Sequence, residues 1–135
     1  MVGIGKYWYG KVRTIEVGVS AVNSGSTTEV PMFSAPFRCQ VKKAAIIAKT
    51  AITGVETNNM VLGFKNKGAT GAGTDVVASK TFTTNVNASA FAETDLGAVS
   101  YGVLPLATSI SFYKDENGTG MNMPDLVAKL EIIRI

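Results

Sequence analysis

The chain contains 135 residues with a mass of 14.2 kDa, a length that predicts one domain. It has no histidine, and Cys39 is its only cysteine. These counts exclude an intrachain disulfide, a cysteine-based zinc site, and any catalytic or metal site that needs a histidine of this chain.

The charge of the chain is small and evenly spread. Thirteen basic and ten acidic residues give a formal net charge of +3, and charged residues make up 17% of the sequence. The longest basic run is the pair Lys42-Lys43, so the sequence lacks the basic stripe that is typical of nucleic-acid binding. It also lacks a classical signal sequence and an apolar run long enough for a membrane-spanning helix. We therefore expect neither a nucleic-acid partner nor a membrane partner.

The first eleven residues differ from the rest of the chain. Three glycines interrupt them, so we interpret residues 1–11 as an extended N-terminal arm and residues 12–135 as a single β domain. The arm carries one basic and three aromatic side chains in succession, Lys6, Tyr7, Trp8 and Tyr9. Such side chains are enriched at binding hot spots, because a rigid ring buries a large area with little loss of entropy. Two interpretations stay open: these residues bind a partner, or Trp8 packs across one end of the domain's own core.

Several segments show the period-2 alternation of half-buried strands. Within residues 12–22, Ile15, Val17, Val19 and Ala21 share one face, and within residues 59–65, Met60, Leu62 and Phe64 do so. Over residues 126–135, Leu126, Ala128, Leu130 and Ile132 point one way, while Lys129 and Glu131 point the other way. Further strands are expected over residues 76–83, 91–99 and 109–114.

Residues 38–52 form a longer and less regular apolar segment. Cys39 and Val41 alternate with polar residues, whereas residues 44–48 are apolar throughout. This pattern predicts a strand covered on both faces, or a strand with a β-bulge near Ala44 that switches the phase of the alternation. A helix is the competing interpretation, because alanine favours helices, but the β-branched residues that follow favour the strand. We expect Cys39 to be a small buried side chain rather than a reactive thiol.

Polar segments rich in Gly, Asn, Ser and Thr separate the strands and predict loops at residues 23–29, 66–74, 84–90 and 116–120. Two of these regions have a partial likeness to functional loops. The glycines of residues 68–73 lack the spacing of a phosphate-binding loop, and residues 115–120 lack the alternating acids and closing glutamate of a calcium loop. We therefore interpret both as turns and expect no cofactor and no metal.

Seven or eight strands joined by such loops, without a convincing amphipathic helix, predict two packed antiparallel sheets. The expected fold class is all-β, an antiparallel β-sandwich or jelly-roll-like domain that follows the N-terminal arm. The sequence contains no arrangement of nucleophile, base or paired acids typical of an active site, so we expect no catalytic residues and no enzymatic activity.

Residues 35–135 carry a more specific pattern. An apolar strand, APFRCQVKKAAIIAKTAITG, precedes NNMVLGFKNKGATGAGT with its polar Gly/Thr loop. The approach Gly102-Val-Leu104-Pro105, the turn Gly118-Thr-Gly120 and a final alternating strand follow. In this arrangement the chain resembles the small β-sandwich structural proteins of tailed bacteriophages, and among them the head decoration (cement) proteins.

This resemblance implies a non-enzymatic virion structural protein on the outer surface of an icosahedral phage capsid. Such a protein stabilises the shell by bridging neighbouring capsid subunits, so the implied partners are the major capsid protein and further copies of the chain, in a homotrimer or a dimer. The expected contact residues are Lys6, Tyr7, Trp8 and Tyr9 of the arm, with Lys67 and Thr70 of the 66–74 loop. The alternative is a tail, baseplate or head-fibre module that binds carbohydrate on the host surface.

Overall fold

A computed structural model of the protein describes residues 11–135, and the arm residues Lys6, Tyr7, Trp8 and Tyr9 lie outside this range. Over the described residues the chain forms nine strands and no helix. The strands are β1 (Val12–Val19), β2 (Thr28–Ser34), β3 (Cys39–Ala48), β4 (Met60–Gly68), β5 (Asp75–Thr81), β6 (Glu93–Asp95), β7 (Val103–Leu104), β8 (Ser109–Glu116) and β9 (Leu126–Arg134). With no helix in residues 11–135, this part of the chain offers none that is long and apolar enough to cross a membrane.

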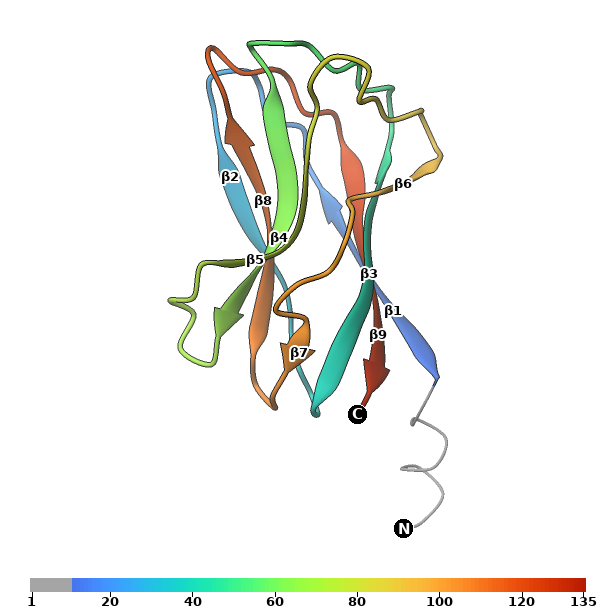
Figure 1. The fold of residues 1–135 in the computed structure, drawn as a ribbon, viewed down its shortest axis with the longest axis vertical. Helices are drawn as coiled ribbons and strands as arrows, with labels where there is room; N and C mark the ends of the chain where they lie inside the picture. The colour runs from blue at the N-terminus through green and yellow to red at the C-terminus, as the bar shows by residue number, and fades with distance from the viewer. Residues whose placement is uncertain (1–10) are drawn as a thin grey trace.

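The strands form two sheets that pack face to face (Figure 1). One has the order β1-β9-β3-β6, with β7 also paired to β3, and the other has the order β2-β8-β4-β5. All strand pairs within the two sheets are antiparallel. The prediction of an antiparallel β-sandwich is confirmed.

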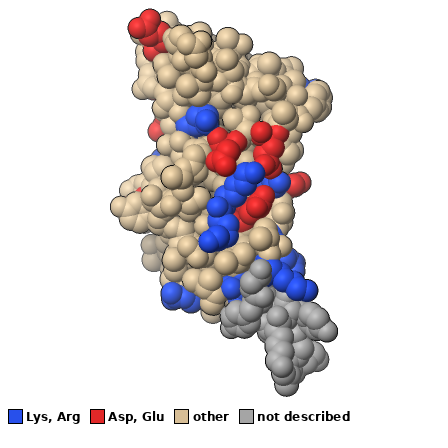
Figure 2. All heavy atoms as spheres, turned by 45° about the vertical axis from the view of Figure 1, so that its right-hand side comes forward, with Lys and Arg blue, Asp and Glu red and all other residues tan. Residues whose placement is uncertain are grey.

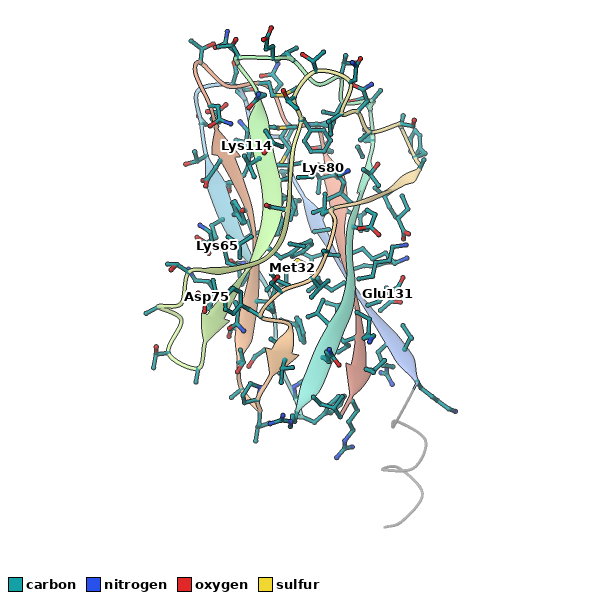
Figure 3. The ribbon with its side chains drawn as sticks, viewed as in Figure 1. Met32, Lys65, Asp75, Lys80, Lys114 and Glu131 are labelled. Carbon is teal, nitrogen blue, oxygen red and sulfur yellow. The ribbon has the colours of Figure 1, made fainter. Side chains whose placement is uncertain are left out.

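The core lies between the sheets, where the alternating apolar side chains meet. Alternate residues are buried along β9 from Leu126 to Ile132 and in the first part of β4 from Met60 to Phe64, as the alternation predicts. Phe64 of β4 and Phe112 of β8 pack edge to face, with ring centroids 5.4 Å apart. Met32 of β2 points into the same layer (Figure 3).

Strand β3 confirms the predicted change of phase. Its pairing with β9 shifts register between Val41 and Lys43, so a β-bulge at this point leaves two residues of β3 opposite one of β9. Cys39 and Val41 face the core before the bulge, and Ala44, Ile46 and Ala48 face it afterwards, all buried.

The strand β2 was not predicted, and the expected loop at residues 23–29 is wrong at its end, because β2 begins at Thr28. β2 is an edge strand of its sheet, paired only with β8. Its Pro31 has no N–H to donate, and an edge strand tolerates this because one side of it needs no partner. A register shift between Pro31 and Phe33 also hides the alternation.

Two further expectations need correction. The strand expected over residues 91–99 shrinks to β6, because Phe91 and Gly97 have φ of +59° and +103° and turn the chain out of the extended conformation. The loop expected at residues 66–74 begins later, because β4 continues to Gly68 beside β8. The turns at residues 84–90 and 116–120 are confirmed, with a positive φ at Asn85 and Gly118.

Candidate functional site

The structure separates the contact residues chosen from the sequence. Lys67 lies on β4, where its Nζ is 2.9 Å from the Glu29 carboxylate of β2. Ser111 donates a hydrogen bond of 2.6 Å to the same carboxylate, and this bond, followed by the Lys67 contact, lowers the pKa of Glu29. Thr70 lies in the loop beyond β4 and is exposed. Lys67 is therefore held within its own sheet, while Thr70 is free to contact a partner.

Apolar side chains are exposed at the end of the sandwich where β1 begins and β9 ends. We call this surface the apolar end, and it consists of Val12, Val103, Leu106 and Ile135. Leu106 is 65% exposed, in the turn between β7 and β8. The other three lie at the same end of one sheet, in which the strand order β1-β9-β3-β7 leaves Ile133 and Gln40 between Val12 and Val103 (Figure 1). Sequence reasoning missed Val103 and Leu106, because β7 is too short to show any alternation.

A groove with a volume of 270 Å³ lies next to the apolar end, between the two edge strands β1 and β2. Its walls are mostly apolar, and its lining residues are Arg13, Ile15, Phe33, Ser34, Pro36, Phe37 and Ile132. The Arg134 guanidinium lies 5.0 Å from the centroid of the Phe37 ring, a cation–π contact beside the groove. Such a groove suits a single aromatic or aliphatic side chain.

The opposite side of the sandwich is closed by a strap, residues 96–102. The amide of Leu96 donates to Ala44 of one sheet, and the amide of Ser100 donates to Val77 of the other. The strap then returns to the first sheet, where the amide of Val41 donates to Gly102. Beside the strap lies a cleft of 610 Å³, lined by Gln40, Val41, Lys42, Asn66, Val99, Tyr101, Gly102 and Val103.

Tyr101 is the conspicuous residue of this cleft. It is 62% exposed and has a φ of +52°, an unusual conformation for an aromatic residue. The side-chain amide of Asn66 donates to the Tyr101 carbonyl and helps to hold this conformation. The cleft thus displays an aromatic ring next to amide and ammonium groups.

The end of the sandwich opposite the apolar end is fixed by a buried lysine (Figure 3). Lys114 follows Ile110 and Phe112 on the core-facing side of β8, and its side chain is fully buried. Its Nζ donates to the carbonyl oxygens of Asn23 and Ser26, at 3.0 and 2.7 Å, and to the Glu116 carboxylate at 3.0 Å. These three acceptors satisfy the ammonium group and fasten the β1–β2 loop to β8.

Glu116 extends this cluster to a second loop. Its Oε2 accepts the amides of Gly25 and Met121, each at 3.1 Å. Burial raises the pKa of Glu116, but the hydrogen bonds from Lys114 and from these amides outweigh burial, and the net pKa is lowered. We call Lys114, Glu116 and the loop residues bound to them the polar end.

The outer face of the five-stranded sheet carries ion pairs. Glu93 of β6 pairs with Lys43 of β3 and Lys129 of β9, and Glu131 lies 3.6 Å from the Lys129 ammonium. Hydrogen bonds from Lys129 and then Lys43 lower the pKa of Glu93. Figure 2 shows acidic and basic groups intermixed on this side, so the face presents no field of a single sign.

The described residues include no group of three or more metal-ligating side chains. Cys39 is fully buried in the core, which raises the pKa of its thiol and confirms the expected structural role.

Neither a protein-family model nor a curated protein matches the chain. Among solved structures it is similar to "Crystal structure of infectious bursal disease virus VP2 subviral particle", with a TM-score of 0.44, 11% identity and coverage of 93% of this chain. It is also similar to the structures of the Gx and Gt strains of the same virus, with TM-scores of 0.42 and 0.40 and identities of 11% and 13% over 93% and 92% of this chain. The chain spans about a third of the length of each of these, 33% in all three.

Proposed function

We propose that this protein is a non-enzymatic virion structural protein, which binds the outer face of an icosahedral phage capsid and bridges neighbouring capsid subunits. Its partners are the major capsid protein and further copies of itself. The sequence resemblance over residues 35–135 supports this assignment, and the β-sandwich is the fold which that resemblance implies.

The apolar end is the observation that carries the proposal. A surface formed by Val12, Val103, Leu106 and Ile135 gains free energy when a partner covers it, because burial removes apolar area from water. β1 begins at this end, and residues 1–10, which include the expected hot-spot residues Tyr7, Trp8 and Tyr9, precede it in the sequence.

Area considerations are compatible with several contacts on one small protein. The described residues expose 7006 Å² within the structure, and a standard interface uses about 800 Å² per partner. One copy therefore has room for a self-contact and a capsid contact together. Many copies on one shell add avidity, so no single contact must be strong.

A matched pair of substitutions tests the proposal on undecorated heads. Val103→Glu places a charge in the apolar end, and Val55→Glu places the same charge away from it; the two valines are 44% and 40% exposed. We expect Val103→Glu to reduce occupancy of the heads at least tenfold, about 1.4 kcal/mol of binding free energy, and Val55→Glu to bind like the wild type. Equal occupancy for both variants would contradict the proposal.

Deletion of residues 1–10 tests the role of the arm in the same assay. We expect occupancy to fall because Tyr7, Trp8 and Tyr9 are lost as anchors. Unchanged binding would remove the arm from the proposal. Thr70→Glu tests the loop contact in the same way.

The cleft beside the strap favours a second candidate function, the carbohydrate-binding tail or head-fibre module. Tyr101 displays its ring beside Gln40 and Lys42, and an aromatic face with amide groups suits a sugar ring. Electron microscopy of labelled protein separates the two functions: label over the head supports decoration, and label at the tail supports the module. Binding on a glycan array that Tyr101→Ala abolishes would also favour the module.

A further inference from the structure

We propose that the cleft beside the strap binds a saccharide that carries a carboxylate group. This rests on the second candidate function and deepens it, because it names the class of sugar that the cleft takes. Three features of the cleft carry the inference: the way in which the chain builds it, the polar groups in it that lack a partner, and the sign of its charge.

The cleft results from a detour of the strap away from β3. The strap bonds to β3 at both of its ends, but between them it crosses to Val77 of the other sheet. The bulge of β3, between Val41 and Lys43, lies in the stretch of β3 that this detour leaves uncovered. Lys42, the extra residue of the bulge, therefore lines the cleft together with Tyr101 of the strap. The volume of 610 Å³ lies in the range of about 300–1,000 Å³ that is typical of small-molecule sites, and is sufficient for a small saccharide.

The backbone of Tyr101 is fixed before any ligand binds. The preceding residue, Ser100, donates its amide to one sheet, and the carbonyl of the following residue, Gly102, accepts an amide of the other. The side-chain amide of Asn66 donates to the Tyr101 carbonyl at 3.1 Å. A Cβ at Gly102 would lie 2.7 Å from a methyl group of Val99, so the strap is closely packed at this point. A ligand that stacks on Tyr101 therefore pays little entropy for ordering the chain that carries the ring.

Three side chains of the cleft have polar groups that are available to a ligand. Within residues 11–135, the amide of Gln40, the ammonium of Lys42 and the hydroxyl of Tyr101 take part in no hydrogen bond and no ion pair. The adjacent Lys43, by contrast, is paired with Glu93. The cleft thus contains an aromatic ring, an amide and an ammonium group that the fold itself does not use.

These groups match the parts of an acidic sugar. One face of a pyranose ring consists of C–H groups and packs on the ring of Tyr101, while Val99 and Val103 supply apolar walls. The Gln40 amide both donates to and accepts from sugar hydroxyls. The Lys42 ammonium donates to the carboxylate, and such a charge-assisted hydrogen bond is stronger than one between neutral groups.

The charge of the cleft favours an acidic sugar over a neutral one. Of the described residues that line the cleft, Lys42 is the one charged side chain, so no acid there offsets it. A second pocket, of 210 Å³, gives a useful contrast, because its Phe91 is also exposed and also has a positive φ. Lys49 and Asp125 both line that pocket, so its charges are balanced. We therefore expect a preference for carboxylates at Tyr101 and none at Phe91.

An NMR titration of the free, ¹⁵N-labelled full chain is the first test. The probes are methyl glucuronide and methyl glucoside, which share a ring and differ in a carboxylate against a hydroxymethyl group, with methyl N-acetylneuraminide as a second acidic sugar. We expect an acidic sugar to bind at least about tenfold more tightly than the glucoside, the effect of one hydrogen bond to a charged group. Amide shifts should change at residues 40–42, 66 and 99–103.

Three results of this titration would overturn the inference. They are a neutral sugar that binds as tightly as both acidic ones, shift changes centred on residues 47–49 and 125–127, and no saturable binding of either acidic sugar. Sodium acetate is a further probe. If acetate binds as tightly as the acidic sugars, the cleft recognises an anion and not a saccharide, which also contradicts the inference.

Substitutions then assign the two parts of the ligand to two side chains. Lys42→Gln should abolish the preference for the acidic sugar, whereas Lys49→Gln, at another exposed lysine, should keep it. Tyr101→Ala should weaken binding of acidic and neutral sugars alike, by about tenfold, and Phe91→Ala should leave binding unchanged. All four side chains are exposed, and thermal denaturation checks that each variant is folded. A preference that survives Lys42→Gln, or binding that survives Tyr101→Ala, would contradict the assignment.

These outcomes separate the inference from the proposed functions. If acidic and neutral sugars bind the cleft equally well, the carbohydrate-binding module stands and the preference for carboxylates fails. If heads are decorated by a chain that binds no saccharide, the inference fails and decoration stands. The titrations use the free chain because Val103 belongs both to the cleft and to the apolar end.

Discussion

The two ends of the sandwich differ in the side chains that they carry: charged groups bound inside the molecule at one end, and exposed apolar side chains at the other. At the polar end, Lys114 and Glu116 bind the backbone of the loops around them, so charged groups are satisfied inside the molecule. At the apolar end, Val103 and Leu106 are 44% and 65% exposed, so apolar area faces outward. The difference indicates that the first end serves the stability of the fold, whereas the proposed contact with other molecules uses the second.

Lys114→Met should have the largest effect on stability and therefore tests the polar end most directly. The substitution leaves the carbonyls of Asn23 and Ser26 without their donor and Glu116 without its cation. We expect a loss of about 3 kcal/mol or more in the free energy of unfolding, as for other broken buried charge pairs. Urea denaturation measures it, and Lys49→Met, at an exposed lysine, should stay within about 0.5 kcal/mol of the wild type. Equal losses of unfolding free energy in both variants would show that the buried cluster around Lys114 contributes no more to stability than an exposed lysine.

Gly120→Ala should have the next largest effect. Gly120 has a φ of +73°, and a Cβ there would lie 1.6 Å from the Glu116 Oε2 atom, so the carboxylate must leave its position. We expect a destabilisation of about 2 kcal/mol, in the range of strained backbone positions. Gly71→Ala is the matched control, because Gly71 has a φ of +81° with open space around it. Its cost should be about 1 kcal/mol, from backbone strain alone.

Acid should loosen the polar end before it affects the apolar end. The pKa of Glu116 in the folded protein is below its ordinary value of 4.5, so its contribution to stability is complete above pH 4.5 and is lost as the pH falls through the lowered pKa. The Gly25 and Met121 amides, which donate to Glu116, should lose hydrogen-exchange protection in this range, after correction for intrinsic rates. Glu116→Gln should remove this pH dependence. Protection that persists in both amides at low pH would contradict the assignment.

A substitution at the apolar end should have the smallest effect on folding. Leu106→Asp replaces a side chain that is 65% exposed in a turn, so we expect the free energy of unfolding to change by less than about 0.5 kcal/mol. Thermal and urea denaturation measure it in the isolated protein. A large destabilisation would mean that Leu106 serves the fold itself, and the contrast between the two ends would then disappear.

Regular alternation made most of the fold predictable from the sequence. Alternate side chains are buried along most of β9 and in the first part of β4, and the change of phase in β3 is visible as the shift from Cys39 and Val41 to Ala44. β2 escaped prediction because Pro31 and the bulge after it interrupt the pattern at an edge strand. The strand expected over residues 91–99 failed because φ is positive at Phe91, whose amide donates to the distant Ala48, and at Gly97, whose amide donates to the Asp95 side chain.

The site was harder to predict than the fold. A lysine in a strand is normally assigned to the solvent face, yet Lys114 continues the core-facing series of Ile110 and Phe112, which is the signal that marks it. The apolar end has no such signal, because Val12 and Val103 reach the same end of the sheet only through the strand order β1-β9-β3-β7. Such a surface results from the strand topology, so no local sequence pattern predicts it.

The position of β1 has a mechanical consequence. β1 pairs with β9 over eight consecutive positions, from Val12 to Val19, and its hydrogen bonds lie across the strand direction. Tension applied at Val12 along the strand loads all of these bonds together in shear. Tension that separates Val12 sideways from Ile133 opens them one after another. The β1–β9 pairing therefore resists a pull applied at Val12 along β1 better than a sideways pull at the same residue.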